Sequence, residues 1–298
     1  MSQVSAKVIA HSKNKETGKE IITYELEYPR LILAEVNTHR ALSKNTSSSR
    51  AIPVSKINQM VWDNPAMPVR FGKHNKGMQD AGEHNELITM YSDAKAMTPD
   101  EAWTWAAQQA TVVSEAFEHA GYAKQVCNRL TEPVQRVRQV VTATEWNDFF
   151  WLRNHEAADP TFDALAKEML KAKEKSTPVL LDKGEWHMPY FEDGYWKEDC
   201  DVPLQDALDI SASCCAQVSF RALDDTLEKA RSVVEKLNLR GQNGEPVHAS
   251  PVEHQATPIF SVHDEGVTHL TMDGGIWSAN FKDWAQHRQM IPNHYKKD

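Results

Sequence analysis

The sequence predicts an α+β fold, and two groups of local signals support this prediction. Residues 7–10 and 21–27 (IITYELE) have strand composition, and the turn KNKETGK between them favours a hairpin. Thr98, Pro99 and Glu101 form a capping box with proline at the first helical position, which predicts a long helix ending at Gly121. Strand pairs and helices in separate parts of one chain are typical of α+β proteins.

The other elements are predicted from apolar spacing and from turn residues. The segment RLILAEVNTHRAL after Pro29 suits a short, largely buried helix, and residues 64–85, rich in Pro, Gly, His and Asn, suit a long loop. Asp159 and Pro160 begin a helix that continues to Ala172. A short helix is predicted in YAKQVCNRLTEP (122–133). An amphipathic segment follows, QRVRQVVTATEWNDFFWLRNH (135–155), and the residues expected on its core face are Val137, Val140, Val141, Phe149, Phe150 and Leu152. The rest of the chain is predicted as an irregular aromatic segment at 177–200, a helical region at 205–239 and a loop at 240–258.

Composition restricts the classes of function. The net charge of −9 and the pI of about 5.8 argue against non-specific nucleic-acid binding, which needs a basic surface. The sequence contains no apolar run of membrane-spanning length, and MSQVSAKVIAHSKNK has no apolar core of a signal peptide. The four cysteines form no CxxC pair. We therefore expect a reduced, cytoplasmic protein that binds neither membrane nor nucleic acid.

The window NTHRALSKNTSSSRAIP (37–53) concentrates basic residues and hydroxyls between apolar segments. Arg offers a planar fork of donors and Ser adds a donor and an acceptor, so such a window can bind phosphate. Solvated loops have a similar composition. The residues alone leave both interpretations open.

The spacing in this window is H-R-x-x-S-x-N-x-x-S-x-R, formed by His39, Arg40, Ser43, Asn45, Ser48 and Arg50. This spacing resembles the signature R-H-R-x-x-S-x-N-x-x-S-x-R of the flavin-dependent thymidylate synthases (ThyX). Thr38 stands where the family has its first Arg. Thr46 replaces an acidic residue that is common in the family. Both substitutions lie beside the expected pocket, so the affinity for nucleotide or flavin could differ.

Further segments resemble the same family and extend the similarity over most of the chain. NRLTEP and LRNHEAADP resemble its two arginine-bearing segments, with Arg129 and Arg153 at the arginine positions and with His155 and Asp159 departing from the pattern. CCAQVSF (214–220) and HASPVEH (248–254) resemble segments that precede the signature in ordinary members but follow it here. This order implies a circularly permuted, phage-type member. DWAQHR (283–288) resembles the start of the signature a second time, so either His39–Arg40 or His287–Arg288 could contact the flavin.

The resemblance implies a ThyX-like fold, in which helices flank a central, mainly antiparallel sheet beside a helical portion. It implies one domain of 298 residues in permuted order: a strand, helix and signature module (1–60), a helical nucleotide-binding module (61–200) and a C-terminal module resembling the usual N-terminal half (201–298). Family members are homotetramers with shared active sites. The expected location is the cytoplasm, which would be the host cytoplasm if the protein is phage-encoded.

The implied reaction is reductive methylation of deoxyuridine monophosphate with methylenetetrahydrofolate, FAD and NADPH. The resemblance places Arg153 and Ser48 in catalysis, and Ser48, Ser49, Arg50, Arg129 and Arg153 in substrate binding. It places His39, Arg40, Asn45, Ser250 and His254 at the cofactor. No metal is expected, because the spacing H-x-x-x-x-E-H in HASPVEH is not that of a zinc hydrolase.

Two other functions stay open. A flavin-dependent hydroxymethylase acting on deoxyuridine or deoxycytidine monophosphate would share the same sites, and the substitutions at Thr38, Thr46 and Asp159 keep it under consideration. A degenerate flavin-binding or nucleotide-binding subunit would retain the fold without activity. Cys214 and Cys215 lie in an apolar stretch and are expected to be packed and inert rather than nucleophilic.

Overall fold

A central five-stranded sheet organises the protein. The computed structural model describes residues 3–296 except 78, 91–94, 220–222 and 243. The strand order is β3-β4-β2-β1-β5, with β1 at Ser5–Asn14, β2 at Glu20–Pro29, β3 at Ser43–Thr46, β4 at Arg136–Ala143 and β5 at Val179–Leu181. Only the short β1–β5 pairing is parallel among these described strands. The predicted α+β class and the mainly antiparallel central sheet are confirmed.

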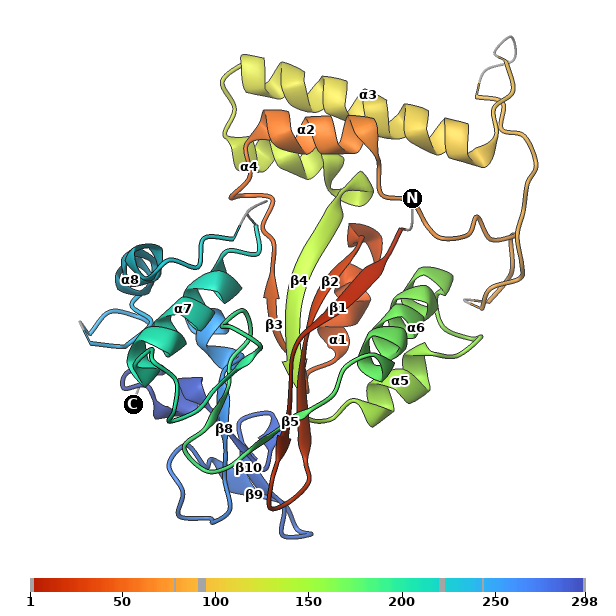
Figure 1. Cartoon of the computed structure of the whole chain (residues 1–298). Helices are drawn as coiled ribbons and strands as arrows, with labels where there is room; N and C mark the ends of the chain where they lie inside the picture. Colours follow the sequence, from red (N-terminus) through yellow and green to blue (C-terminus); the bar gives the residue numbers. More distant parts are fainter. Residues whose placement is uncertain (1–2, 78, 91–94, 220–222, 243, 297–298) are drawn as a thin grey trace.

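One face of the central sheet carries the main hydrophobic core. Tyr24, Tyr28 and Val141 are fully buried there against Phe149 and Phe162. The latter two belong to α5 (Asn147–Arg153) and α6 (Pro160–Glu174), which cover this face together with α1 (Leu33–Thr38) (Figure 1). The predicted α6 begins as expected, with Asp159 as its N-cap.

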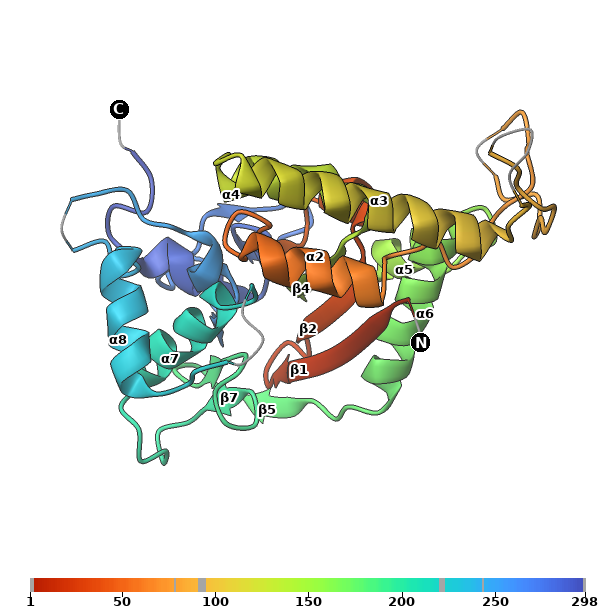
Figure 2. The ribbon, with the colours of Figure 1, turned by 90° about the horizontal axis from the view of Figure 1, so that it is seen from above.

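A helical layer lies across one end of the sheet. It contains α2 (Val54–Asp63), the long α3 (Pro99–His119), α4 (Lys124–Cys127) and a 3-10 segment, η2 (Asn128–Val134) (Figure 2). The capping box predicted at the start of α3 is present: the Thr98 side chain accepts from Glu101 N, and the Glu101 carboxylate accepts from Thr98 N at 2.8 Å. A short 3-10 turn, η1 (Arg30–Ile32), connects β2 to α1.

The C-terminal part packs against the opposite face of the sheet, where Ile9 and Val140 contact Tyr190, Cys215 and Val218. Its helices are α7 (Leu204–Ala216) and α8 (Leu227–Lys236), with 3-10 turns η3 (Ser250–Glu253) and η4 (His287–Met290). Its strands form two small sheets. One has the order β12-β8-β6-β7, with β6 at Trp186–His187, β7 at Tyr195–Trp196, β8 at Ala256–Pro258 and β12 at Trp284–Gln286. The other has the order β11-β10-β9, with β9 at His269–Leu270, β10 at Ile276–Ser278 and β11 at Phe281–Lys282.

The interpretation of residues 135–155 as one amphipathic segment with a single core face is wrong. The first part is strand β4 and only the second part is helix α5. Val140 faces the C-terminal part whereas Val141 faces α5 and α6, and Leu152 is half exposed. The reason is physical: closely spaced Val and Thr side chains fit a pleated strand better than a helix.

Two other segments need smaller corrections. The aromatic segment at 177–200 contains the three short strands β5, β6 and β7, although most of it is irregular. The predicted helical region at 205–239 is two helices, α7 and α8, and residues 220–222 between them lie outside the described part of the chain. Among the described residues, no helix is long and apolar enough to span a bilayer.

Candidate functional site

The serine-rich window borders a pocket of about 320 Å³ between α2, the start of β4 and the C-terminal part. We call its segment Ser47–Pro53 the pocket loop. The residues that line the pocket include cations (Arg30, Lys56, Arg136, Arg138), the carboxylate of Glu27, hydroxyls (Ser47, Ser49, Ser219) and apolar groups (Ile52, Ile57, Met60, Val218). A volume of this size, with apolar walls and a few convergent polar groups, is typical of a small-molecule site.

The backbone of the pocket loop is held in place by hydrogen bonds. Ser47 N donates to Arg138 O at 2.8 Å, and Arg138 N donates to Ser47 Oγ at 3.0 Å. The fully buried Asn128 amide donates to Ser49 O at 2.6 Å and to the carbonyl of Ile52 at 2.9 Å. A loop fixed in this way loses little entropy when it binds a ligand.

Three of the four pocket cations lie on or directly after two paired strands, and the fourth, Lys56, lies on α2. Arg30 directly follows β2, and Arg136 and Arg138 lie on the same face of β4 because side chains alternate along a strand. Two carboxylates balance part of this charge: Glu27 lies 3.3 Å from Arg136 NH1, and Glu132 lies 3.3 Å from Arg30 NH2. The pocket keeps an excess of positive charge among its lining side chains.

The residues predicted to bind substrate through the pocket loop are adjacent in space. Ser49 is buried and lines the pocket, while its hydroxyl donates to Glu132 at 2.8 Å. Ser48 N donates to Ser219 Oγ at 2.9 Å. The side chains of Arg50 and Arg129 are exposed at the surface, outside the lining of the pocket. Their roles stay predictions.

Arg153 lies outside this pocket. Its Nε donates to His39 Nε2 at 2.9 Å, its guanidinium stands 4.5 Å from the centre of the Phe162 ring, and Glu35 is 3.4 Å from NH1. Burial, followed by the Arg153 and Lys44 cations, lowers the pKa of His39 to about 4, so His39 is a neutral acceptor at pH 7. His39 and Arg153 therefore form one unit on the face of the sheet covered by α5 and α6.

Of the residues predicted at the cofactor, Asn45 and Ser250 contact each other, and the other three do not join them in one cluster. Arg40 is exposed, whereas Asn45 Nδ2 donates to Cys215 O at 2.5 Å and Ser250 Oγ donates to Asn45 Oδ1 at 3.3 Å. These last contacts pack β3 against α7 and η3. His254 is fully buried. Within a single chain, contacts inside the fold therefore occupy the side chains of Asn45, Ser250 and His254.

His254 belongs to a buried row of hydroxyls and imidazoles that we call the hydroxyl seam, running from β1 across β2 to β4. His187 bridges Ser12 Oγ (2.9 Å) and Thr23 Oγ1 (2.8 Å). Thr23 Oγ1 contacts Thr142 Oγ1 at 2.7 Å, which in turn contacts His254 Nδ1 at 2.8 Å. All five side chains are buried, and desolvation lowers the pKa of each histidine to about 3.

The two substituted signature positions have local partners. Thr38 Oγ1 donates to Glu35 O at 2.6 Å at the end of α1. Thr46 Oγ1 accepts from Gln139 Nε2 at 2.6 Å, and Tyr28 donates to the same Gln139 side chain at 2.8 Å. Each threonine therefore completes a hydrogen bond inside the fold.

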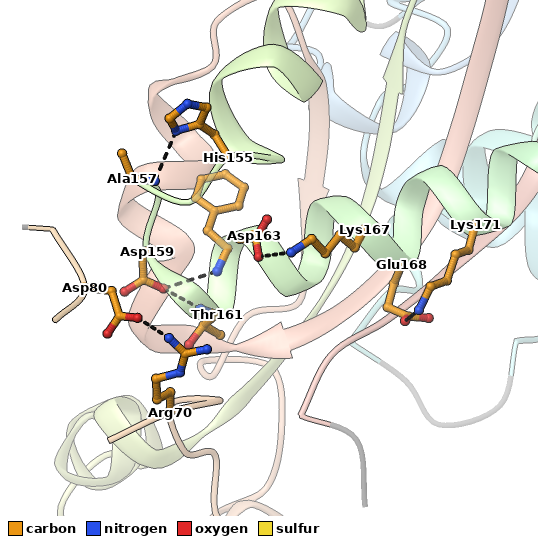
Figure 3. Close-up of polar contacts among 11 residues, drawn as sticks. Arg70, Asp80, His155, Ala157, Asp159, Thr161, Asp163, Lys167, Glu168 and Lys171 are labelled. Carbon is orange, nitrogen blue, oxygen red and sulfur yellow. Dashed lines mark hydrogen bonds and ion pairs between the residues drawn. The ribbon is translucent and has the colours of Figure 1, made fainter. Parts of the chain in front are cut away.

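The substituted positions of LRNHEAADP shape the start of α6 (Figure 3). Asp159 Oδ1 accepts from Thr161 N at 2.8 Å and from Phe162 N at 3.2 Å, which satisfies two free N–H groups of the helix. His155 Nδ1 accepts from Ala157 N at 3.1 Å. Both side chains thus have local structural partners.

The second copy of the His–Arg pair is engaged inside the protein. Arg288 NH1 is 2.5 Å from Glu253, the acidic residue of HASPVEH. His287 packs edge-on against Trp186 at 5.7 Å between ring centres, and burial lowers the pKa of His287 to about 4. Arg40, by contrast, is exposed. Arg40 is therefore more exposed than Arg288, whose side chain is about one-third exposed.

The two adjacent cysteines are buried, and Phe220, the last residue of CCAQVSF, lies outside the described residues. Burial raises the pKa of Cys214 to about 12 and also raises the pKa of Cys215 well above the usual range of a thiol. A buried thiol of this kind is a poor nucleophile. Among the described residues, no group of three or more His, Cys, Asp or Glu could hold a metal ion.

Sequence reasoning missed the cations that line the pocket, namely Arg30, Lys56, Arg136 and Arg138. A signal was available in the alternation Arg136-Val137-Arg138, which places two arginines on one face of a strand. Interpreting the segment as a single amphipathic unit hid that alternation.

Comparisons with known proteins give limited similarity. No protein-family model and no curated protein matches the sequence. Similar solved structures include two of ThyX from Helicobacter pylori with FAD and dUMP, at TM-score 0.33 and 15% and 16% identity, covering 51% of this chain and 67% of that chain. They also include the UMP/dUMP methylase PolB from Streptomyces cacaoi bound with 5-Br UMP, at TM-score 0.42 and 13% identity, covering 59% of this chain and 90% of that chain. At these scores the likeness carries no functional argument, so the proposals below depend on the residues of this chain.

Proposed function

We propose that the protein is a nucleotide-modifying enzyme, a flavin-dependent C5 methyltransferase that converts deoxyuridine monophosphate to thymidine monophosphate. The observation that carries the proposal is that the serine-rich signature borders a cationic pocket. Ser49, which lies between the signature residues Ser48 and Arg50, and Ser219 of CCAQVSF, 170 positions apart in the sequence numbering, line the same cavity. The reaction itself is proposed from the sequence resemblance to the flavin-dependent thymidylate synthases.

The pocket suits the phosphate end of a nucleotide. Arg30 and Arg138 offer planar donor forks, and a phosphate accepts charge-assisted hydrogen bonds from such groups. The walls formed by Ile57 and Met60 are apolar and suit the flat, less polar face of a sugar and base. The exposed Arg50 and Arg129 are proposed to close over the nucleotide from outside, as the resemblance implies.

Arg153 is proposed to stabilise negative charge on the pyrimidine ring. His39 accepts from its Nε and Phe162 lies under its guanidinium, so the orientation of Arg153 is fixed before a substrate arrives. Since Arg153 lies on the other face of the sheet from Arg138, one chain does not offer both to one ligand. We therefore propose that a second copy supplies Arg153, in a homotetramer with shared sites.

None of the five residues predicted at the cofactor lines the pocket described above. Asn45 and Ser250 are hydrogen-bonded to each other, and His254 is buried, whereas Arg40 is exposed and His39 is partly exposed. FAD, with NADPH and methylenetetrahydrofolate as the other reactants, is thus proposed from the resemblance, and its site would need residues of another copy.

Two measurements test the proposal. The visible spectrum of the purified protein should show oxidised flavin, and a colourless protein that does not take up FAD would refute the flavin assignment. Incubation with dUMP, methylenetetrahydrofolate and NADPH should give a product whose mass corresponds to an added methyl group. A hydroxymethyl product, or modification of dCMP alone, would replace the thymidylate synthase assignment by the hydroxymethylase alternative.

Shared sites have a separate test. Arg50→Ala and Arg153→Ala should each abolish turnover as pure proteins, because each removes a charge-assisted contact worth about 1.5–3 kcal/mol or more. When the two inactive variants are unfolded together and refolded as mixed oligomers, sites with both arginines intact should restore part of the activity. Mixed oligomers without activity would mean that each chain builds its own complete site.

A further inference from the structure

We propose that Glu132 determines the charge of the anion that the pocket accepts, so that a nucleoside monophosphate is preferred over a diphosphate or triphosphate. This inference rests on the proposed nucleotide site and adds a specificity residue to it. Glu132 lies in the segment NRLTEP, where the sequence resemblance assigns a role only to Arg129.

Glu132 contacts two donors that line the pocket. A single oxygen, Oε1, accepts from Ser49 Oγ at 2.8 Å and lies 3.3 Å from Arg30 NH2. The Glu132 side chain is one-third exposed, so it is anchored in the wall of the site without being sealed off from it. The carboxylate therefore stands beside the donors that an incoming phosphate would use.

Without Glu132 the pocket would be strongly cationic. The lining contains four cationic side chains (Arg30, Lys56, Arg136 and Arg138) and one carboxylate, Glu27. Adding Glu132 leaves two positive charges in excess, since four cations are set against two carboxylates. A phosphate monoester near neutral pH carries about two negative charges, so the charges of pocket and ligand balance for a monophosphate.

The repulsion between Glu132 and a bound anion grows with the charge of that anion. By Coulomb's law a triphosphate with twice the charge of a monophosphate experiences about twice the repulsion at the same distance, and more charge would remain unbalanced in the pocket. Removing the charge of Glu132 should therefore favour the triphosphate more than the monophosphate. A residue that only positions Ser49 and Arg30 would alter both affinities by the same factor.

The test is equilibrium binding of dUMP and dUTP to the full-length protein, in buffer with a chelator to remove magnesium. Wild type should bind dUMP at least as tightly as dUTP. Glu132→Gln keeps the acceptor for Ser49 and removes the charge, and it should raise the affinity for dUTP relative to dUMP about tenfold. The matched control is Glu168→Gln on α6, which removes the same charge from a surface pair with Lys171 and should leave the ratio unchanged.

Two outcomes would overturn the inference: an unchanged ratio of dUTP to dUMP affinity in Glu132→Gln, or the same rise in the Glu168→Gln control. Arg30→Gln provides an independent variant if Glu132→Gln does not fold, and it should lower the affinity for dUTP more than that for dUMP. The series is repeated with inorganic phosphate and tripolyphosphate. If these anions show the predicted shift while no nucleotide binds, the specificity role of Glu132 stands and the proposed function fails.

Discussion

The hydroxyl seam should make the folded state sensitive to mild acid. His187 and His254 are fully buried, and one donor and one acceptor nitrogen on the bridging ring of His187 complete the hydrogen-bond chain through Thr23 and Thr142. A neutral imidazole meets this requirement, whereas an imidazolium has two donors and a charge without a buried counterion among these contacts. Desolvation accordingly lowers the pKa of both rings to about 3.

The size of the effect follows from proton linkage. In the unfolded chain both histidines titrate near pH 6.5. Above that pH neither the folded nor the unfolded state binds a proton at these rings, so they do not reduce the free energy of unfolding. As the pH falls from 6.5 towards 3, the unfolded state binds more protons than the folded state, and stability decreases. At pH 5 each ring contributes a loss of about 2 kcal/mol, since one pKa unit is about 1.4 kcal/mol. Two rings together remove about 4 kcal/mol from a typical total of about 5–15 kcal/mol.

Urea unfolding at pH 7, 6 and 5, followed by tryptophan fluorescence, measures this loss. His254→Asn keeps a hydrogen-bonding atom near the position of Nδ1 and cannot titrate, so the slope of stability between pH 6 and 5 should decrease by about 1.4 kcal/mol per pH unit. The exposed His263→Asn is the control and should leave the slope unchanged. A wild-type stability that does not change between pH 7 and 5, or an unchanged slope in His254→Asn, would refute the reasoning.

Two further predictions concern the framework of the site. Asn128→Ala removes two hydrogen bonds to the pocket loop and leaves two carbonyls unsatisfied, so denaturant unfolding should show a loss of about 2 kcal/mol or more, and dUMP affinity should fall. Gly194→Ala should destabilise far more than Gly184→Ala, because both have positive φ but only at Gly194 would a Cβ lie within 2.8 Å of the neighbouring strand. Comparable thermal midpoints for the two glycine variants would contradict this explanation.

The sequence predicted those parts of the fold that depend on local signals. The β1–β2 hairpin, the capping box of α3 and the N-cap at Asp159 are each determined by residues a few positions apart. Strand β4 was missed because it is paired on both sides, with β2 and β3, and its two faces pack against different parts of the chain. Both faces of β4 are therefore buried, so its sequence lacks the regular alternation of apolar and polar residues that marks a strand with one exposed face.

The same distinction explains what could be predicted of the candidate site. The window containing Ser48 and Ser49 was found because its residues are contiguous. The cations were not found, because Arg30 and Arg136 become neighbours only through the pairing of β2 with β4, more than 100 positions apart in the sequence. No local pattern encodes such a register, and the pocket exists only once the sheet has formed.

The contacts between the signature and the C-terminal segments bear on the predicted permutation. Asn45 binds Cys215 O and Ser250, and Ser48 N donates to Ser219, so β3 and the pocket loop are joined to CCAQVSF and HASPVEH by direct hydrogen bonds. The entropic cost of closing a loop grows only slowly with its length, so contacts of this kind can persist when the order of segments along a chain changes. These hydrogen bonds join segments that lie about 170 to 205 positions apart in the sequence. The permutation itself stays a prediction.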